Sequence, residues 1–341
     1  MHACVQFIIH FYKQNEKRRT KINFCPKCGY EIPVDKVKFC YECGYKFGES
    51  TGVKESVIEP LDSLDISFAD TSDTFDFSSL NIESSDSVDD LQIDSDLVIK
   101  NGVLLEYKGK NKRVTIPSTV TKIDNEAFYM NDYVEEVTVG TNVKEIGDEA
   151  FIEFKNLRMV SLPEGLKKIG RGAFAFNERL TVIDIPRSVA EIGENAFENT
   201  GMSSVVIPKG VEAISDEAFR ICPNLKKVTI SEGVKTVGVN AFELCESLTT
   251  VNLPSTLRSI EHGTFTGTAI SSIDLPEGLL EIDSYAFFEC VNLKEIKIPK
   301  SVKRIEGDAF VSCTSLKKIY VPRHLIFEYS YSKFKAEIIY Y

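Results

Sequence analysis

Nine phenylalanines recur along the chain at an almost constant spacing. Successive members are 23 residues apart, except for two intervals of 22 residues. A fixed period in this range is the sequence signature of a solenoid, in which each repeat stacks on its neighbours. The spacing therefore predicts a stacked array with a spine of buried rings along its inner face, formed by Phe128, Phe151, Phe174, Phe197, Phe219, Phe242, Phe265, Phe287 and Phe310.

A strand-like phrase follows each repeat phenylalanine. It has the form Leu-x-x-Val/Ile-x-Ile/Leu-Pro, as in residues 180–186 and 248–254. Alternating apolar residues that end at a proline predict a short strand, because proline lacks the N–H that would continue a ladder. The Ala-Phe segment, rich in Asp, Glu, Asn and Gly, predicts a tight turn or a one-turn helix. We therefore expect a mainly β solenoid of short strands and one-turn helices.

Four of the nine cysteines obey the same period. Each lies three residues after a repeat phenylalanine, a position that Asn131 and Asn177 occupy in earlier repeats. A buried cysteine behaves mostly as a small hydrophobe, so we interpret these thiols as structural, in preference to disulfide or catalytic roles. They are Cys222, Cys245, Cys290 and Cys313.

The phrases I-P-x-x-V-x-x-I-G-x-x-A-F and C-x-x-L-x-x-I-x-I-P closely resemble the BspA-like class of leucine-rich repeats, over roughly residues 97–322. The resemblance implies a right-handed curved solenoid, an asparagine/cysteine ladder at the position described above, and a role in adhesion or protein binding. Gly140 and Ser231 replace the strand-ending proline, and two units, near Thr200 and Thr268, are one residue short. We expect the short units to change the curvature locally.

Both ends of the repeat region are predicted to be capped, as a solenoid requires. Residues 97–116 contain a hairpin pattern in which Asn101-Gly102 suits a type I′ turn. Residues 323–341 keep aromatic residues but lose the repeat, which predicts a C-terminal cap.

Two Cys-x-x-Cys-Gly knuckles lie near the N-terminus, with eleven residues between them. Four thiolates at this spacing close a tetrahedral Zn²⁺ site with no open position for substrate. Residues 23–48 are therefore predicted to form a structural zinc ribbon that is unfolded without metal. Iron in a rubredoxin-like site and a disulfide framework are the alternatives. The predicted ligands are Cys25, Cys28, Cys40 and Cys43.

Residues 49–96 differ in kind, with fourteen Asp or Glu and one Lys. This composition buries too little apolar surface to order itself and predicts a disordered acidic linker. Apolar residues among the acids are consistent either with a short docking motif or with a plain solubilising spacer. They are Ile66, Phe68, Phe75, Phe77 and Leu80.

Residues 1–22 are predicted to be a poorly ordered extension or a short helix, with a membrane-surface helix as an alternative. The apolar stretch 4–12 is too short to cross a bilayer, and the basic run 17–19 follows it instead of preceding it, unlike a secretory signal. No other segment reaches eighteen apolar residues, so no transmembrane segment is expected.

Catalysis is not expected, because an active site needs convergent titratable groups. None of the four histidines, at positions 2, 10, 262 and 324, lies near another at a spacing useful for catalysis, and no phosphate-binding loop or nucleophile elbow is present. The outward columns of the repeated strands mix both signs of charge, which opposes binding to a phosphate backbone. Three apolar residues on these columns, Met159, Val182 and Val206, flanked by Asp184 and Lys227, are either a partner-binding patch or scattered exposed side chains.

These observations favour a non-enzymatic scaffold that binds a protein partner through the concave face of the solenoid, with the zinc ribbon as a second docking module. The missing export signal and the four-thiolate set favour the cytoplasm. A cell-surface adhesin is the main alternative. A nucleic-acid-associated regulator is a second alternative, because residues 1–48 carry nine Lys or Arg against four Asp or Glu.

Overall fold

The computed structural model of the chain describes residues 23–24, 31–32, 95–129, 131–325 and 336–341. The chain divides into two compact units, residues 1–84 and 85–341. In the first unit, β1 (Asn23–Phe24) and β2 (Glu31–Ile32) pair as a two-stranded antiparallel sheet.

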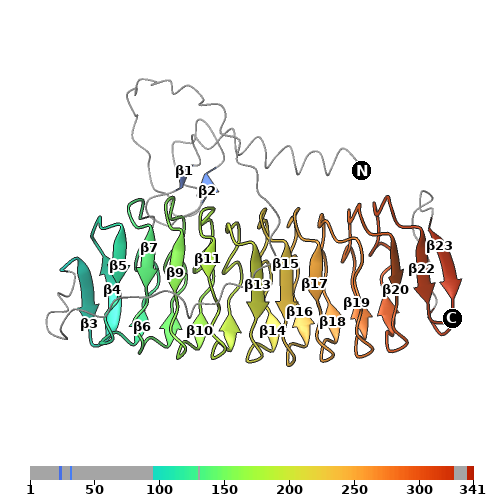
Figure 1. Cartoon of the computed structure of the whole chain (residues 1–341), viewed down its shortest axis with the longest axis horizontal. Helices are drawn as coiled ribbons and strands as arrows, with labels where there is room; N and C mark the ends of the chain where they lie inside the picture. The colour runs from blue at the N-terminus through green and yellow to red at the C-terminus, as the bar shows by residue number, and fades with distance from the viewer. Residues whose placement is uncertain (1–22, 25–30, 33–94, 130, 326–335) are drawn as a thin grey trace, which may run out of the picture. The chain divides into compact units, whose positions relative to one another are not determined.

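The second unit is a mainly β solenoid of about ten turns, with two rows of parallel strands (Figure 1). One row, here called the major face, contains the strands that follow the repeat phenylalanines and one equivalent strand before Phe128. It is divided into three sheets, with strand orders β11-β9-β7-β5, β13-β15-β17 and β20-β22-β23. Its strands are β5 (Arg113–Thr115), β7 (Glu136–Thr138), β9 (Met159–Ser161), β11 (Val182–Ile183), β13 (Ser204–Ile207), β15 (Lys227–Ile230), β17 (Thr250–Asn252), β20 (Glu295–Lys297), β22 (Lys318–Val321) and β23 (Glu337–Tyr340).

The other row, the minor face, consists mostly of two-residue strands and forms two sheets, β12-β10-β8-β6-β4-β3 and β14-β16-β18-β19-β21. All of its pairs are parallel except β3–β4. The strands are β3 (Leu97–Lys100), β4 (Val103–Tyr107), β6 (Lys122–Ile123), β8 (Glu145–Ile146), β10 (Lys168–Ile169), β12 (Glu191–Ile192), β14 (Ala213–Ile214), β16 (Thr236–Val237), β18 (Ser259–Ile260), β19 (Glu281–Ile282) and β21 (Arg304–Ile305).

The strand-ending proline makes the corner between the two faces. Its carbonyl accepts a hydrogen bond from the amide three residues later, as in Leu166 N to Pro163 O at 3.0 Å. Gly140 makes the same bond with Val143 at 3.1 Å, so losing the proline there does not remove the corner. The corner therefore depends on the turn geometry more than on the proline ring.

The Ala-Phe segments form a third side of each turn, here called the turn edge. From Phe128 to Phe287, the backbone amide of each repeat phenylalanine donates to the carbonyl of the residue just before the phenylalanine of the next turn. Phe151 N to Ala173 O, at 2.9 Å, is an example. Left-handed residues lie two positions before and two positions after the phenylalanine, such as Glu149 (φ 56°) and Glu153 (φ 57°). The one-turn helix that we considered for this segment is wrong, because left-handed residues break the run of right-handed dihedrals that a helix needs.

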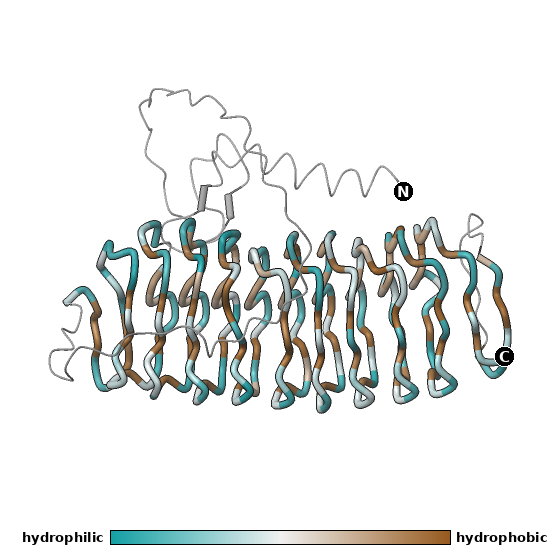
Figure 2. Tube along the Cα trace, in the orientation of Figure 1, coloured by the Kyte–Doolittle hydropathy of each residue, from teal (hydrophilic) through white to brown (hydrophobic). Residues whose placement is uncertain are grey.

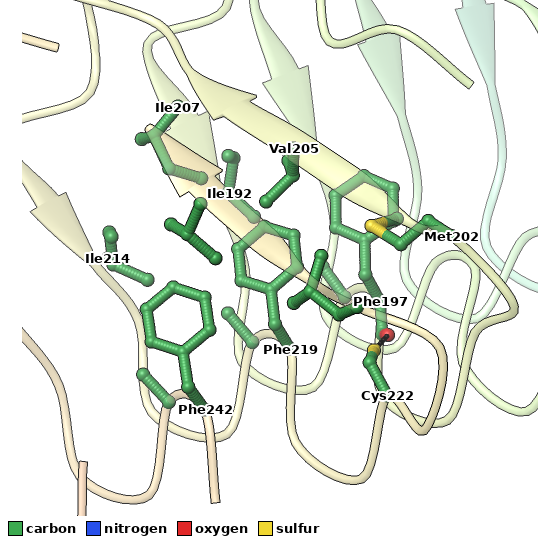
Figure 3. Packing of buried hydrophobic residues seen from close by; sticks show 14 of the residues in the cluster. Ile192, Phe197, Met202, Val205, Ile207, Ile214, Phe219, Cys222 and Phe242 are labelled. Carbon is green, nitrogen blue, oxygen red and sulfur yellow. Dashed lines mark hydrogen bonds between the residues drawn. The ribbon is translucent and has the colours of Figure 1, made fainter. Parts of the chain in front are cut away.

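The repeat phenylalanines stack in one continuous column inside the solenoid. All nine are almost fully buried, and neighbouring ring centroids are 4.8–5.7 Å apart. Tyr107 extends the column at the N-terminal end, 5.1 Å from Phe128. Figure 3 shows three of these rings packed between aliphatic side chains of the two faces. Hydrophobic residues recur at matching places in successive turns (Figure 2), so one core runs the length of the array.

The N-terminal hairpin is confirmed. β3 and β4 pair antiparallel around Asn101 (φ 53°) and Gly102 (φ 75°), the two positive φ values that a type I′ turn requires. The predicted cap 97–116 is too long, because β5 inside it belongs to the major face. At the other end, β23 continues the major face in parallel register with β22. The C-terminal segment therefore adds a strand to the repeat sheet.

The two short units interrupt the sheets. Between β11 and β13, here called the first break, both the major and the minor face are divided. At the second break, between β17 and β20, only the major face is divided, because β18 and β19 remain paired on the minor face. Residues 272–274, which the period predicts to be a strand, are not one. The missing residue lies between the repeat phenylalanine and the following major-face strand, near Thr200 and Thr268, so that strand is shifted out of the position that a parallel ladder needs.

Candidate docking site on the major face

Side chains of the major face are held in register by the parallel ladders. Arg113 lies opposite Glu136, Glu136 opposite Met159, and Met159 opposite Val182. Because alternate residues of a strand point to opposite faces, these side chains project outward while Val114 and its equivalents fill the core. The period thus generates straight columns of exposed side chains.

Three aliphatic side chains on this face are exposed and lie around the first break. Met159 is 38% exposed, Val182 46% and Val206 59%. Met159 and Val182 lie on neighbouring strands of the sheet that ends at β11. Val206 lies on β13, which begins the next sheet. We call these three residues the break patch; it spans two sheets.

Charged and polar residues border the break patch. Asp184 directly follows β11 and is exposed, as is Lys227, which lies opposite Ser204 in the next sheet. On the N-terminal side, Lys112 and Arg158 both contact Glu135. The hydrogen bond from Lys112 is the main cause that lowers the pKa of Glu135, so this carboxylate stays ionised and paired. The patch is therefore an aliphatic surface with charges of both signs at its margins.

The second break provides a natural contrast. The outward residues around it are Thr250, Asn252, Ser272 and Asp274, all exposed and all polar. Both breaks occur at a repeat unit that is one residue short, but the outward side chains are aliphatic at the first break and polar at the second. Exposed aliphatic side chains are thus not a necessary consequence of a short unit.

The position three residues after each repeat phenylalanine forms a ladder of buried hydrogen bonds. Each cysteine there donates to the phenylalanine carbonyl of the preceding turn, as in Cys245 Sγ to Phe219 O at 3.1 Å. Asn177 bonds the carbonyls of both Phe151 and Phe174, each at 2.8 Å. All four ladder cysteines are free and buried. Burial raises the pKa of Cys290 to about 11.

Sequence reasoning missed the ladder residues of the two short units. Thr200 and Thr268 are fully buried there, and each hydroxyl donates to the phenylalanine carbonyl of its own turn, at 3.1 and 3.0 Å. Each also lies 3.3 Å from the next cysteine sulfur. The signal was present in the sequence, because both threonines are three residues after a repeat phenylalanine.

A half-buried ion network, which the sequence pattern did not single out, crosses the first break at the turn edge. Arg220 contacts Glu198 at 3.2 Å, Glu217 at 3.2 Å and Glu243 at 2.7 Å. The side chains of Arg220 and Glu198 are only 15% and 8% exposed. Burial raises the pKa of Glu198, and the charge of Arg220 opposes that rise. We call this network the Arg220 clasp.

The four predicted zinc ligands lie outside the described residues. The two strands of the first unit bracket the first knuckle in sequence, because β1 ends directly before Cys25 and β2 begins after Tyr30. Four thiolates from two Cys-x-x-Cys-Gly sequences are a donor set that suits a structural Zn²⁺ ion. Elsewhere in the described part of the chain, no three His, Cys, Asp or Glu side chains are grouped to hold a metal.

The solenoid shows no convergence of histidine with a nucleophile among its described residues. His262 makes an edge contact with Tyr285, and the His324 ring lies 3.0 Å from the carbonyl of Val302. A hollow beside β22 is lined by Lys294, Lys317 and three uncharged residues, without a carboxylate, histidine or thiol. In the part of the chain with assigned structure, no helix is long and apolar enough to cross a membrane.

Comparison with known proteins agrees with this architecture. A family model described as a BspA type leucine rich repeat region, in six copies, matches residues 103–226 and 212–336, more than half of the chain. None of the curated proteins matches the chain.

Several solved structures are similar. A leucine-rich repeat protein from Bacteroides ovatus is 25% identical, with a TM-score of 0.50 over 65% of this chain and 67% of that one. A leucine-rich repeat protein of T. pallidum is 25% identical, with a TM-score of 0.42 over 56% and 82%. A leucine rich cell surface protein from Faecalibacterium prausnitzii is 24% identical, with a TM-score of 0.35 over 70% and 94%.

Proposed function

Because the chain belongs to the BspA-type leucine-rich-repeat family, we propose that it is a non-enzymatic scaffold that binds a protein partner on the major face. Solenoids of this kind offer extended surfaces instead of enclosed pockets, and such surfaces are used for binding. The break patch is the proposed centre of the contact. Leucine-rich-repeat proteins generally mediate protein–protein interactions, which is consistent with this role.

The exposure of Met159, Val182 and Val206 is the observation that carries the proposal. A soluble array can place a polar residue at every outward position, as the second break does with Thr250, Asn252 and Ser272. Burying these exposed aliphatic side chains against a partner removes them from water, which favours binding. Rim charges such as Asp184 and Lys227 would then orient the partner.

Site-specific photo-crosslinking in cells tests the proposal. A photoreactive amino acid at Ser204, beside the break patch, is expected to give discrete protein adducts. Val182→Glu is expected to abolish them, because a charge placed in the aliphatic surface must be desolvated on binding. Thr250→Glu, the change at the equivalent exposed position before the second break, is expected to leave them intact. Adducts that persist in Val182→Glu would remove the break patch from consideration.

We also propose that Cys25, Cys28, Cys40 and Cys43 hold a structural zinc ion, and that the ribbon is a second docking module. Support comes from the four-thiolate set and from the β1–β2 pair around the first knuckle. Two modules on one chain raise the effective concentration of the second contact once the first has formed.

The thiolate set also supports a reducing compartment, and we propose the cytoplasm as the location. Protease added to intact cells distinguishes this from the cell-surface alternative. A solenoid that survives the treatment supports the cytoplasmic scaffold, and a solenoid that is cleaved supports an adhesin.

A further inference from the structure

Regular neighbouring turns of the solenoid are connected on all three sides. Between the turns of β9 and β11, for example, Val182 N donates to Arg158 O on the major face at 3.1 Å. On the minor face, Ala190 N donates to Lys167 O at 2.9 Å. On the turn edge, Phe174 N donates to Ala196 O at 2.8 Å. Three lines of backbone bonds fix the angle between two such turns.

At the first break the connection is concentrated on one side. Neither face continues as a sheet from the turn of β11 and β12 to the turn of β13 and β14. The turn edge does continue, with Phe197 N to Ala218 O at 2.8 Å and Asn199 N to Arg220 O at 2.9 Å. Ser215 Oγ adds a bond to Ile192 O at 2.6 Å, where the minor strand meets the turn edge.

Side chains reinforce the same edge. Phe197 and Phe219 stack with centroids 5.3 Å apart, and the Cys222 thiol donates to the Phe197 carbonyl at 3.2 Å. The Arg220 clasp joins Glu198, before the break, to residues after it. A charged group shielded from solvent holds its partners more strongly than an exposed pair does. The turn edge therefore carries the backbone bonds, the ring stacking and the ion pairs that join the two parts of the solenoid at the first break.

We propose that the first break is a hinge between two rigid blocks, and that partner binding on the break patch, which rests on the proposed function, selects one hinge angle. Met159 and Val182 belong to the block before the hinge, and Val206 to the block after it. Rotation about the turn edge changes their separation most, because the major face lies away from the axis. A protein partner that contacts both blocks thus binds one angle and fixes it.

Electron–electron distance measurements on the full chain test the hinge. Spin labels carried by non-canonical amino acids at Thr138 and Thr229 span four turns and only the first break. Labels at Thr229 and Tyr320 span four turns and only the second break, where the minor face is continuous. The first pair is expected to give the broader distance distribution. Equal widths would overturn the hinge.

Two variants test whether the missing residue and the Arg220 clasp control the width of the first distance distribution. Inserting one residue after Gly201 restores the 23-residue interval and is expected to narrow the first distribution only. Arg220→Met removes the clasp while keeping an apolar stem, and is expected to broaden the first distribution without changing the second. A first distribution that is insensitive to Arg220→Met contradicts the assigned axis.

The hinge proposal and the docking-site proposal are refuted by different results. The widths are measured without a partner, so adducts that survive Val182→Glu would discard the docking site and leave the hinge standing. Equal widths combined with adducts that are lost in Val182→Glu would discard the hinge and leave the docking site.

Discussion

Residue identity in this protein is set chiefly by position within the repeat. A side chain that recurs every 23 residues packs against its equivalent in the next turn. The phenylalanine rings therefore stack on one another, and each ladder side chain lies beside the phenylalanine carbonyl of a neighbouring turn. Phe154 shows the limit of the rule, because it occupies a ladder position as a fully buried aromatic residue without a donor. A side chain at the ladder position must therefore be one that can be buried, and its ability to form a hydrogen bond is a secondary requirement.

Phe219→Ala is expected to lower the free energy of unfolding by about 3–5 kcal/mol, the usual cost of removing a buried aromatic ring. Phe219 is stacked on both sides, by Phe197 and Phe242, so neither neighbour can fill the hole without leaving the column. Urea unfolding followed by circular dichroism measures the change. Phe176→Ala is the control, because this ring is 39% exposed at the turn edge. Equal losses in the two variants would contradict a structural role for the spine.

Three of the ladder thiols, Cys245, Cys290 and Cys313, are expected to resist alkylation in the folded protein at pH 8. Burial raises the pKa of Cys245 well above its ordinary value and that of Cys290 to about 11, so almost no thiolate is present. Mass-spectrometric mapping of iodoacetamide adducts, with and without denaturant, checks this. Rapid labelling of Cys245 or Cys290 in the native protein would be inconsistent with their burial.

At the scale of the element, short strands are stable here only because they are stacked. A two-residue strand such as β10 makes few bonds of its own, and its pairing with β8 and β12 comes from the repeat. The hairpin β3–β4 could be predicted because its turn chemistry is local. The strand expected at residues 272–274 could not, because its loss depends on how the shortened segment before it places the backbone beside the previous turn.

Gly201→Ala is expected to destabilise the protein at the shortened segment before β13 by about 1–3 kcal/mol, the range for overpacking. A Cβ at this position would lie 2.4 Å from the backbone carbonyl oxygen of Glu178, which cannot move without disturbing the preceding turn. Thermal unfolding monitors the effect. Gly172→Asn is the control, because Asn195 and Asn240 already adopt the same left-handed conformation at equivalent positions. A larger loss in the control would contradict the steric explanation.

At the scale of the whole molecule, the two units are expected to respond separately to metal removal. The proposed zinc ligands all lie in the first unit, whereas the core cluster lies in the second. Chelation is therefore expected to release one zinc ion per chain without changing the melting temperature of the solenoid. Elemental analysis and circular dichroism measure the two quantities. A melting temperature that falls on chelation would show that the solenoid depends on the metal.

The sequence by itself determined the period, the alternation of buried and exposed residues and the phenylalanine spine. These follow from contacts between equivalent positions of adjacent turns, so one period is sufficient to deduce them. The tertiary structure alone decided that a single missing residue divides both faces at the first break but only one face at the second. It alone showed that Arg220 bridges the first break. Those features depend on the stacking of backbones from different turns, which no local pattern encodes.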